Sequence, residues 1–318
     1  MSTSESNIMN GADSLAIDKA VRALKSDLLV AIPTETVYGL AARASSPNAV
    51  KKVFTIKGRP TEHPLILHIA KTQDLTSWSS DLPSAAHALA EKYWPGPLTL
   101  VVRRNNKVSD EITGGRDTVA IRCPSHPITT ELLIRLDDAI VAPSANRFGK
   151  VSPTSARHVA EDFGNEVIVI LDGGECSIGV ESTIVDCTTN PPQILRAGAI
   201  TAEQIEIDCG IAVASASGES RASGMLEKHY APNCTVELAS TLKNAELRLA
   251  NIKSDGRIAE ILDFGADLEM YAHELYSRLR DADRRFVDVV IAVKPAMTGI
   301  GIAINERLKK ASNSASGD

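Results

Sequence analysis

The stretch Ala139-Ile-Val-Ala-Pro-Ser-Ala-Asn146 is the best single guide to the fold of this chain. Its apolar first half is typical of a strand buried inside a sheet, and the hydroxyl of Ser144 and the amide of Asn146 then fall at the tip of that strand. In α/β proteins, ligands bind at the tips of the strands. The stretch therefore predicts an α/β fold with a binding site at this edge of the sheet.

Earlier in the chain, Lys57-Gly-Arg59 lies between an amphipathic run, 46–54, and an apolar stretch, 64–69. This order predicts a helix, a loop and a strand, with both cations on an exposed loop. Two cations that meet a hydroxyl and an amide can hold a phosphorylated ligand.

The composition favours a soluble cytoplasmic protein of two domains. The length of 318 residues is more than one hydrophobic core usually organises. No apolar run approaches the roughly 18 residues of a membrane span, and the polar start, 1–11, does not have the character of a secretory signal, so we expect no membrane contact. The five cysteines show no CxxC spacing and are typical of reduced thiols. The net charge of −6 argues against general affinity for nucleic acid, although it allows one local basic cleft.

Segments with helix and strand periodicity alternate along the chain. In the first two thirds we expect strands at 28–32, 64–69, 98–102, 118–122, 139–142, 167–171 and 184–187, and helices at 13–26, 47–54, 83–93, 128–136 and 154–162. A stretch of small residues, 212–224, has the composition of a linker. After it, strands at 235–238, 258–264 and 287–293 alternate with helices at 242–252, 268–280 and 299–309, which predicts a compact βαβαβα domain.

Short peptides in a fixed order then resemble one family, the L-threonylcarbamoyladenylate synthases in their long form with a C-terminal domain. The matching peptides are PTETVYGL at 33–40, KGRP at 57–60, PLILHI at 64–69, WPGPL at 94–98, DTVAIR at 117–122, APSAN at 142–146, VSPT at 151–154, GVESTI at 179–184, LRAG at 195–198, HYAP at 229–232 and GIAINER at 301–307. They cover nearly the whole chain.

The resemblance implies an α/β fold in three parts. Residues 1–208 are expected to form a YrdC-like catalytic domain, a twisted mixed sheet with a large concave cleft. Residues 209–232 would be a linker that contacts the active site, and residues 233–318 a small Rossmann-like βαβαβα domain. The implied enzyme is a nucleotidyltransferase that makes L-threonylcarbamoyl-AMP and pyrophosphate from L-threonine, bicarbonate and ATP. That product would supply the machinery that places threonylcarbamoyl on an adenosine beside the anticodon of tRNA, and the resemblance allows weak binding of tRNA or double-stranded RNA.

The resemblance also assigns residues. L-Threonine would be bound by Thr36, His68, Arg122, the backbone of Ala142, and Ser182. ATP would be bound by Lys57, Arg59, His63, Thr118, Ser144, Asn146, Ser152, Arg196 and Tyr230, with Lys57 and Arg59 as the catalytic cations. Mg²⁺ is expected to arrive with ATP, because the sequence shows no carboxylate cage of its own. His63 departs from the family, which usually has Asn at this position.

Two other classes of protein stay open on the sequence. A double-stranded RNA or tRNA binder is one, although the acidic balance and the lack of interleaved aromatic and basic residues count against it. A carbamoyl-transfer domain is the other, although the acylphosphatase and zinc-finger-like segments that accompany such domains are not visible. The linker with Tyr230 either covers the cleft and excludes water, or is a plain tether.

Overall fold

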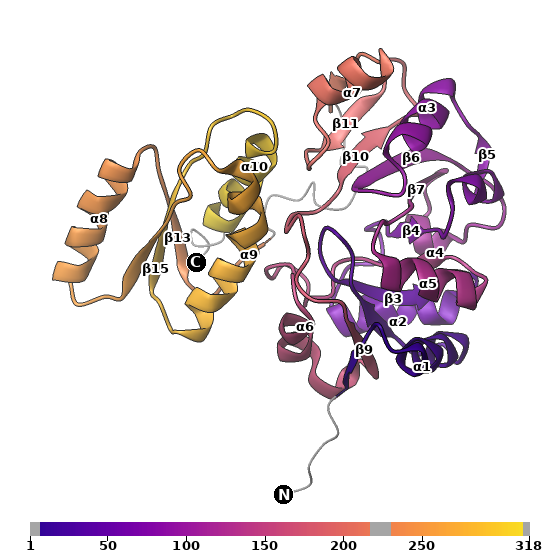
Figure 1. Cartoon of the computed structure of the whole chain (residues 1–318), viewed down its shortest axis with the longest axis horizontal. Coiled ribbons are helices and arrows are strands. Elements are labelled where there is room, and N and C mark those ends of the chain that lie inside the picture. Colours follow the sequence, from indigo (N-terminus) through magenta and orange to yellow (C-terminus); the bar gives the residue numbers. More distant parts are fainter. Residues whose placement is uncertain (1–6, 217–229, 314–318) are drawn as a thin grey trace, which may run out of the picture.

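The computed structural model describes residues 7–216 and 230–313. Two α/β domains lie side by side (Figure 1): a larger one built from the first two thirds of the chain and a smaller one, orange to yellow, built from the last third. This arrangement agrees with the predicted α/β class.

The larger domain is built on one mixed sheet. Its strands are β1 (Ile8–Asn10), β2 (Val30–Ile32), β3 (Gly39–Arg43), β4 (Ile66–His68), β5 (Ser79–Asp81), β6 (Leu98–Arg104), β7 (Thr118–Arg122), β8 (Ile140–Val141), β9 (Val169–Asp172), β10 (Thr183–Asp186), β11 (Gln193–Arg196) and β12 (Ala214–Ser215). They run in the order β1-β9-β2-β3-β8-β4-β7-β6-β10-β11-β12, with β5 paired to β6. Parallel pairs such as β4 with β7 adjoin antiparallel pairs such as β6 with β7, so the sheet is mixed as predicted.

Helices cover both faces of this sheet. They are α1 (Ser14–Lys25), α2 (Pro47–Lys57), α3 (Ser84–Tyr93), α4 (Asp110–Thr113), α5 (Pro127–Leu136), α6 (Ala156–Phe163) and α7 (Ala202–Cys209), with short 3-10 turns at Thr72–Ser77 and Gly164–Glu166. Apolar residues of α1 and α5 share one buried cluster with alternate residues of β2 and β9. Those of α2, α3 and α6 join the cluster on the opposite face. Successive side chains of a strand point to opposite faces of the sheet, so the buried core forms two layers, one on each face.

Helix α2 shows how the sequence brings the first cations to the site. The Ser46 side chain accepts a hydrogen bond from the Ala49 backbone N–H, and Pro47 occupies the first turn, where its missing N–H costs nothing. Gly58 ends the helix with a left-handed φ of 66°. That sharp end turns the chain immediately after Lys57 and directs Arg59 back toward the sheet.

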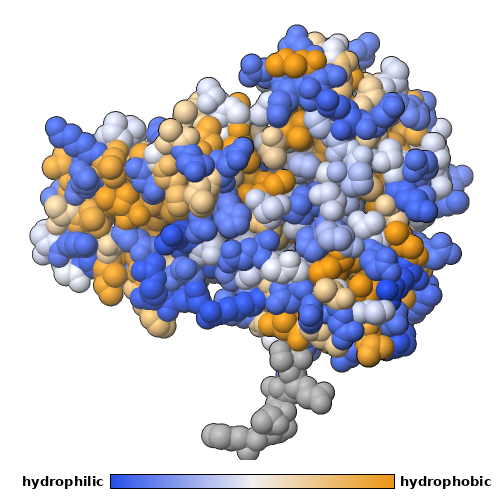
Figure 2. Space-filling model, in the orientation of Figure 1, coloured by the Kyte–Doolittle hydropathy of each residue, from blue (hydrophilic) through white to orange (hydrophobic). Residues whose placement is uncertain are grey.

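The smaller domain has the predicted βαβαβα order. Its elements are β13 (Thr235–Ala239), α8 (Leu242–Ser254), β14 (Ala259–Leu262), α9 (Leu268–Arg284), β15 (Val289–Val293) and α10 (Gly301–Ser312). The three strands are parallel in the order β13-β15-β14. The surface view in Figure 2 shows apolar side chains gathered over this domain, and Leu247 and Phe286 are 62% and 84% exposed.

The two domains share an apolar core. Val37, Val151 and Val180 of the larger domain lie in one buried cluster with residues of α9 and α10. Arg280 of α9 adds an ion pair with Asp162 of α6, at 2.7 Å. The smaller domain is therefore docked against the larger one.

The linker prediction needs one correction. Ala214 and Ser215, placed by the sequence in the linker 209–232, form β12 and pair with β11. A two-residue strand at a sheet edge has no periodicity to reveal it. Of the predicted linker, residues 217–229 lie outside the described residues. In the part of the chain that the structure covers, no helix is both long enough and apolar enough to cross a membrane.

Candidate active site

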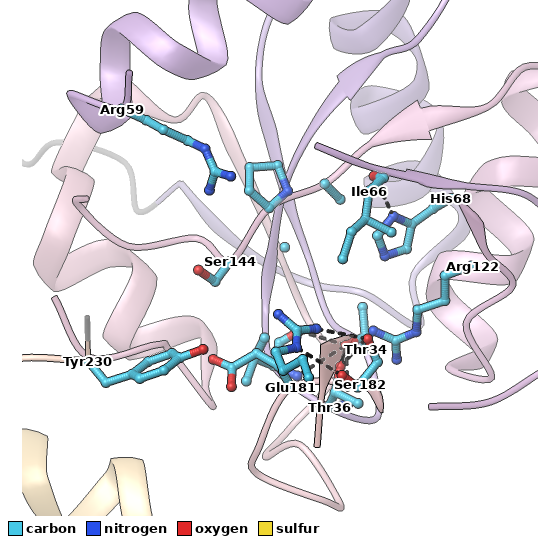
Figure 3. A pocket seen from close by; sticks show the side chains of 15 residues that line it. Thr34, Thr36, Arg59, Ile66, His68, Arg122, Ser144, Glu181, Ser182 and Tyr230 are labelled. Atoms are coloured by element: carbon cyan, nitrogen blue, oxygen red, sulfur yellow. Dashed lines mark hydrogen bonds between the residues drawn. The ribbon is translucent and has the colours of Figure 1, made fainter. Parts of the chain in front are cut away.

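A pocket opens where several strand ends of the larger domain meet the start of the smaller one. It is lined by Thr34, Thr36, Val37, Gly39, Arg59, Ile66, His68, Arg122, Ala142, Pro143, Ser144, Glu181, Ser182, Arg196 and Tyr230. Nine of these were predicted from the sequence, namely Thr36, Arg59, His68, Arg122, Ala142, Ser144, Ser182, Arg196 and Tyr230. Figure 3 shows Arg59 and Ser144 on one side, His68 and Arg122 on the other, and Tyr230, from the end of the predicted linker, at the edge of the pocket.

Arg122, at the end of β7, is held by three partners. Its Nη1 donates to Thr36 Oγ1 at 2.8 Å, and its Nε donates to the Gly96 carbonyl at 3.3 Å. Its Nη2 lies 2.8 Å from Glu35 Oε1, and both side chains are buried. Burial alone would raise the pKa of Glu35, but the Arg122 guanidinium outweighs it and lowers that pKa. Arg122 is therefore fixed in a buried ion pair before any ligand arrives.

His68, at the end of β4, is a neutral acceptor. Its Nδ1 lies 3.1 Å from the Ile66 carbonyl oxygen, which can only accept, so the proton is assigned to Nδ1. Burial lowers the pKa of His68 to about 3, and the charge of Arg122 acts in the same direction. Nε2 thus keeps its lone pair at neutral pH. A ligand hydroxyl or amine beside Arg122 would find a hydrogen-bond acceptor there.

Two more arginines supply positive charge. Arg196 donates from Nη2 to Ser182 Oγ and from Nε to the Ser182 carbonyl, both at 3.0 Å. Arg59 donates from Nη2 to the Pro64 carbonyl at 2.9 Å. Burial lowers the pKa of Arg59 to about 10, so this guanidinium stays charged at neutral pH. Both side chains line the pocket, and the pair suits an anionic ligand.

The prediction that Lys57 lies on an exposed loop is wrong. Lys57 is the last residue of α2 and only 3% exposed, and its ammonium donates to the carbonyls of Ser144 and Asn146. Burial lowers the pKa of this ammonium well below its ordinary value. Arg59, 8% exposed, is not on an exposed loop either. Lys57 does not line the pocket but fixes the turn that carries Ser144, because the tight end of α2 places its ammonium against that turn.

We expect Lys57→Met to lower the free energy of unfolding by about 2–4 kcal/mol, since the carbonyls of Ser144 and Asn146 lose their donor. Urea denaturation measures this. The control is Lys51→Met on the same helix, whose side chain is 61% exposed and lies 3.3 Å from Glu111. That change should stay within about 0.5 kcal/mol. Equal losses in the two variants would show that Lys57 does not hold the turn.

Besides Lys57, four predicted nucleotide residues lie outside the pocket lining. Asn146 donates from Nδ2 to the carbonyls of Arg147 and Lys150, at 2.7 and 2.8 Å. His63 packs its ring against Phe148 with 5.6 Å between centroids. The other two are Thr118, which begins β7, and Ser152, which is fully buried. Their ligand contacts stay predictions.

Glu181 is the charged residue of the pocket lining that the sequence analysis missed. Its Oε1 accepts from Ser152 Oγ at 2.6 Å, and its Oε2 accepts from Tyr276 at 2.9 Å and from Arg307 Nε at 3.2 Å. Burial would raise the pKa of this carboxyl, but Arg307, Arg196 and Ser152 outweigh it and hold the pKa at about 2. One sequence signal existed, because a single acid in the otherwise uncharged peptide GVESTI needs a partner if it is buried.

Acid is expected to weaken the folded protein through Glu181. Its pKa of about 2 lies below the ordinary 4.5, so the carboxylate contributes stability above pH 4.5 that is lost as the pH falls toward 2. Over that range the wild type should lose on the order of 3 kcal/mol more stability than Glu181→Gln. Urea denaturation along a pH series checks this. Parallel declines would show that Glu181 is not the titrating group.

Within residues 7–216 and 230–313, no group of three or more His, Cys, Asp or Glu side chains gathers that could hold a metal ion. The site is made of three buried arginines, a neutral histidine and hydroxyls. Such a set can position an anionic substrate and stabilise developing charge, but it offers no activated nucleophile.

Fold and site together define a two-domain α/β protein with a cationic small-molecule pocket to which the linker contributes Tyr230. Residues 22–198 match the Sua5–YciO–YrdC family, described as telomere recombination, and residues 200–313 match the C-terminal domain of threonylcarbamoyl-AMP synthase. The chain belongs to the Sua5–YciO–YrdC family, in the form that carries this second domain.

Relatives cover almost the whole chain. Threonylcarbamoyl-AMP synthase of Pyrococcus abyssi is 40% identical over 328 residues, which is 96% of each protein. The Bacillus subtilis protein of the same name is 39% identical over 322 residues, or 93% of this chain and 92% of that protein. A crystal structure of P. abyssi Sua5 complexed with L-threonine matches with a TM-score of 0.91 and 40% identity, over 96% of this chain and 97% of that one. These matches confirm the resemblance and the fold.

Proposed function

We propose that this chain is a nucleotidyltransferase that converts L-threonine, bicarbonate and ATP into L-threonylcarbamoyl-AMP and pyrophosphate. Relatives of matching length that bear the name threonylcarbamoyl-AMP synthase support the proposal. The observation that carries it is the pocket, which puts a fixed arginine and a neutral histidine acceptor near two further buried arginines.

The threonine end of the proposed site is formed by Arg122 and His68. The substrate carboxylate would pair with Arg122, whose guanidinium is already oriented by Thr36 and Glu35. The threonine hydroxyl or amine would donate to His68 Nε2, because Nδ1 is committed to the Ile66 carbonyl. Ser182 and the Ala142 backbone complete this end of the lining.

The nucleotide end is formed by Arg59, Arg196, Ser144 and Tyr230. The two guanidiniums would offset phosphate charge. Lys57 would act indirectly, through the turn that carries Ser144. The other residues assigned to ATP by resemblance, His63, Thr118, Asn146 and Ser152, do not line the pocket and would contact only parts of the nucleotide that extend beyond it.

The reaction needs positioning more than covalent help. Bicarbonate takes up a proton and loses water to give CO₂, and the free amine of threonine attacks the CO₂ carbon and releases a proton to form a carbamate. A carbamate oxygen then attacks the α-phosphorus of ATP, and the bond to the β-phosphate oxygen breaks, so that pyrophosphate leaves. Charge moves from the carbamate to the pyrophosphate, where Arg59 and Arg196 would stabilise it.

We propose that Mg²⁺ enters bound to ATP. The only carboxylate on the pocket wall, within the part of the chain that the structure describes, is Glu181, and both of its oxygens already accept hydrogen bonds. An ion carried by phosphate oxygens fits this donor set. We place the reaction in the cytoplasm, where the adenylate would pass to the machinery that transfers threonylcarbamoyl to tRNA.

Pyrophosphate release tests the proposal. We expect release only when ATP, L-threonine and bicarbonate are all present. L-Valine, which has a methyl group in place of the hydroxyl, should be a much poorer substrate, because a hydroxyl partner in the site would stay unpaired. Release that needs neither bicarbonate nor threonine would contradict the proposed reaction.

A further inference from the structure

Four buried side chains form a cluster where the domains meet the pocket. We call it the Glu181 cluster: Glu181, Tyr230, Tyr276 and Arg307. The hydroxyl of Tyr276 on α9 and Nε of Arg307 on α10 both donate to Glu181 Oε2, at 2.9 and 3.2 Å. All four residues are less than 9% exposed, and two of them, Glu181 and Tyr230, line the pocket.

The cluster surrounds Tyr230 on several sides. The Tyr230 ring stacks on the Tyr276 ring with 5.5 Å between centroids and 25° between planes, and the Arg307 guanidinium lies 5.8 Å from the centroid of the Tyr230 ring. Figure 3 shows its hydroxyl directed at the Glu181 carboxylate. The backbone of Tyr230 has a left-handed φ of 64°, which a residue with a Cβ adopts only when its surroundings enforce it. On the backbone side, the N–H of the next residue, Ala231, donates to the Gly149 carbonyl of the larger domain at 2.8 Å.

Arg307 also reaches the wall that carries Arg196. Its Nη1 donates to the Ala197 carbonyl at 2.6 Å, one residue beyond Arg196. Its Nη2 has no hydrogen-bond partner among the described residues. One side chain of the smaller domain thus joins Glu181, the LRAG peptide and the Tyr230 ring.

We propose that Arg307 and Tyr276 are positioning residues for the nucleotide end of the pocket, which act through Glu181 to hold Tyr230 in place. The smaller domain then supplies part of the geometry of the site and is more than a support for the linker. This inference rests on the proposed function, because it takes Tyr230 to contact the nucleotide.

A second buried arginine, Arg280, also links the two domains, and its substitution provides a control for the inference. Arg280 pairs with Asp162 and donates to the Val151 carbonyl, and like Arg307 it is a buried arginine that joins the two domains. Arg280 does not line the pocket, and in the described residues it has no bond to the four members of the Glu181 cluster. Its Nε donates only to the main-chain carbonyl of Ser152, at 3.4 Å, whereas the bond to Glu181 comes from the Ser152 hydroxyl. Arg280→Met is therefore a matched control for Arg307→Met.

Isothermal calorimetry with the full chain measures ATP and L-threonine affinity separately. We expect Arg307→Met to weaken ATP binding by about 10- to 100-fold, the cost of a misplaced contact, while threonine affinity stays within about 3-fold. Arg280→Met should leave both affinities within about 3-fold of the wild type. Equal effects of the two variants, or parallel losses of ATP and threonine binding, would overturn the inference.

Two further variants keep the test decisive if Arg307→Met does not fold. Tyr276→Phe removes only the hydroxyl that donates to Glu181, and we expect it to weaken ATP binding in the same direction by about 3- to 10-fold. In a Tyr230→Ala background, Tyr276→Phe should weaken ATP binding no further, because the side chain through which Tyr276 would act on the nucleotide is absent. An undiminished effect there would contradict the route through Tyr230. A wild-type protein that binds no ATP would instead overturn the proposed function itself.

Discussion

Arg59→Ala is expected to lower the rate of threonylcarbamoyl-AMP formation by roughly 100-fold, about what the loss of one charge-stabilising donor costs. Arg59 lines the pocket, is 8% exposed, and keeps its charge because its pKa stays at about 10. Pyrophosphate release at saturating substrates measures the effect.

The control for this prediction is Arg116→Ala. Arg116 also donates to a backbone carbonyl, that of Glu62 at 2.7 Å, but it does not line the pocket. Its loss should change the rate by less than about 3-fold. Circular dichroism must show both variants folded, because Arg59 also holds the Pro64 carbonyl. Near-normal turnover of folded Arg59→Ala would remove Arg59 from the catalytic assignment.

Arg122→Lys is expected to raise the L-threonine requirement by roughly 10- to 100-fold, the value of one or two charge-assisted hydrogen bonds. The guanidinium meets Thr36 and Glu35 through different nitrogens, whereas a lysine ammonium cannot span both and still face the ligand. The requirement for ATP should stay nearly unchanged. Initial rates over a range of each substrate separate the two effects.

Arg43→Lys is the matched control, since Arg43 forms an ion pair with Asp27 on the surface, with side chains 31% and 30% exposed. We expect that variant to match the wild type. If Arg122→Lys instead raises the threonine and ATP requirements together, Arg122 serves the structure of the sheet rather than threonine recognition.

Local sequence signals predicted much of the fold. The helix expected at 47–54 is α2, which runs three residues further to Lys57, and the alternation after 235 predicted each element of the smaller domain. The two-residue strand β12 gave no such signal, because its pairing with β11 depends on the sheet around it.

The site was predicted less completely, for a physical reason. The resemblance assigned residues that face the pocket, such as Arg122, but it could not show which charges are buried. Lys57 was placed on an exposed loop, yet its ammonium partners lie 87 and 89 residues further along the chain. Glu181 was missed because Tyr276 and Arg307 lie 95 and 126 residues away. Such partners are brought together only by the tertiary fold.

The most direct test of the account is to incubate the full chain with ATP, L-threonine and ¹³C-labelled bicarbonate and to analyse the products by mass spectrometry. A positioned carbamate predicts threonylcarbamoyl-AMP that carries the label, together with pyrophosphate in equal amount. A threonyl adenylate without the label would mean that the threonine carboxylate, not a carbamate, attacks ATP, and it would contradict the assignment of that carboxylate to Arg122.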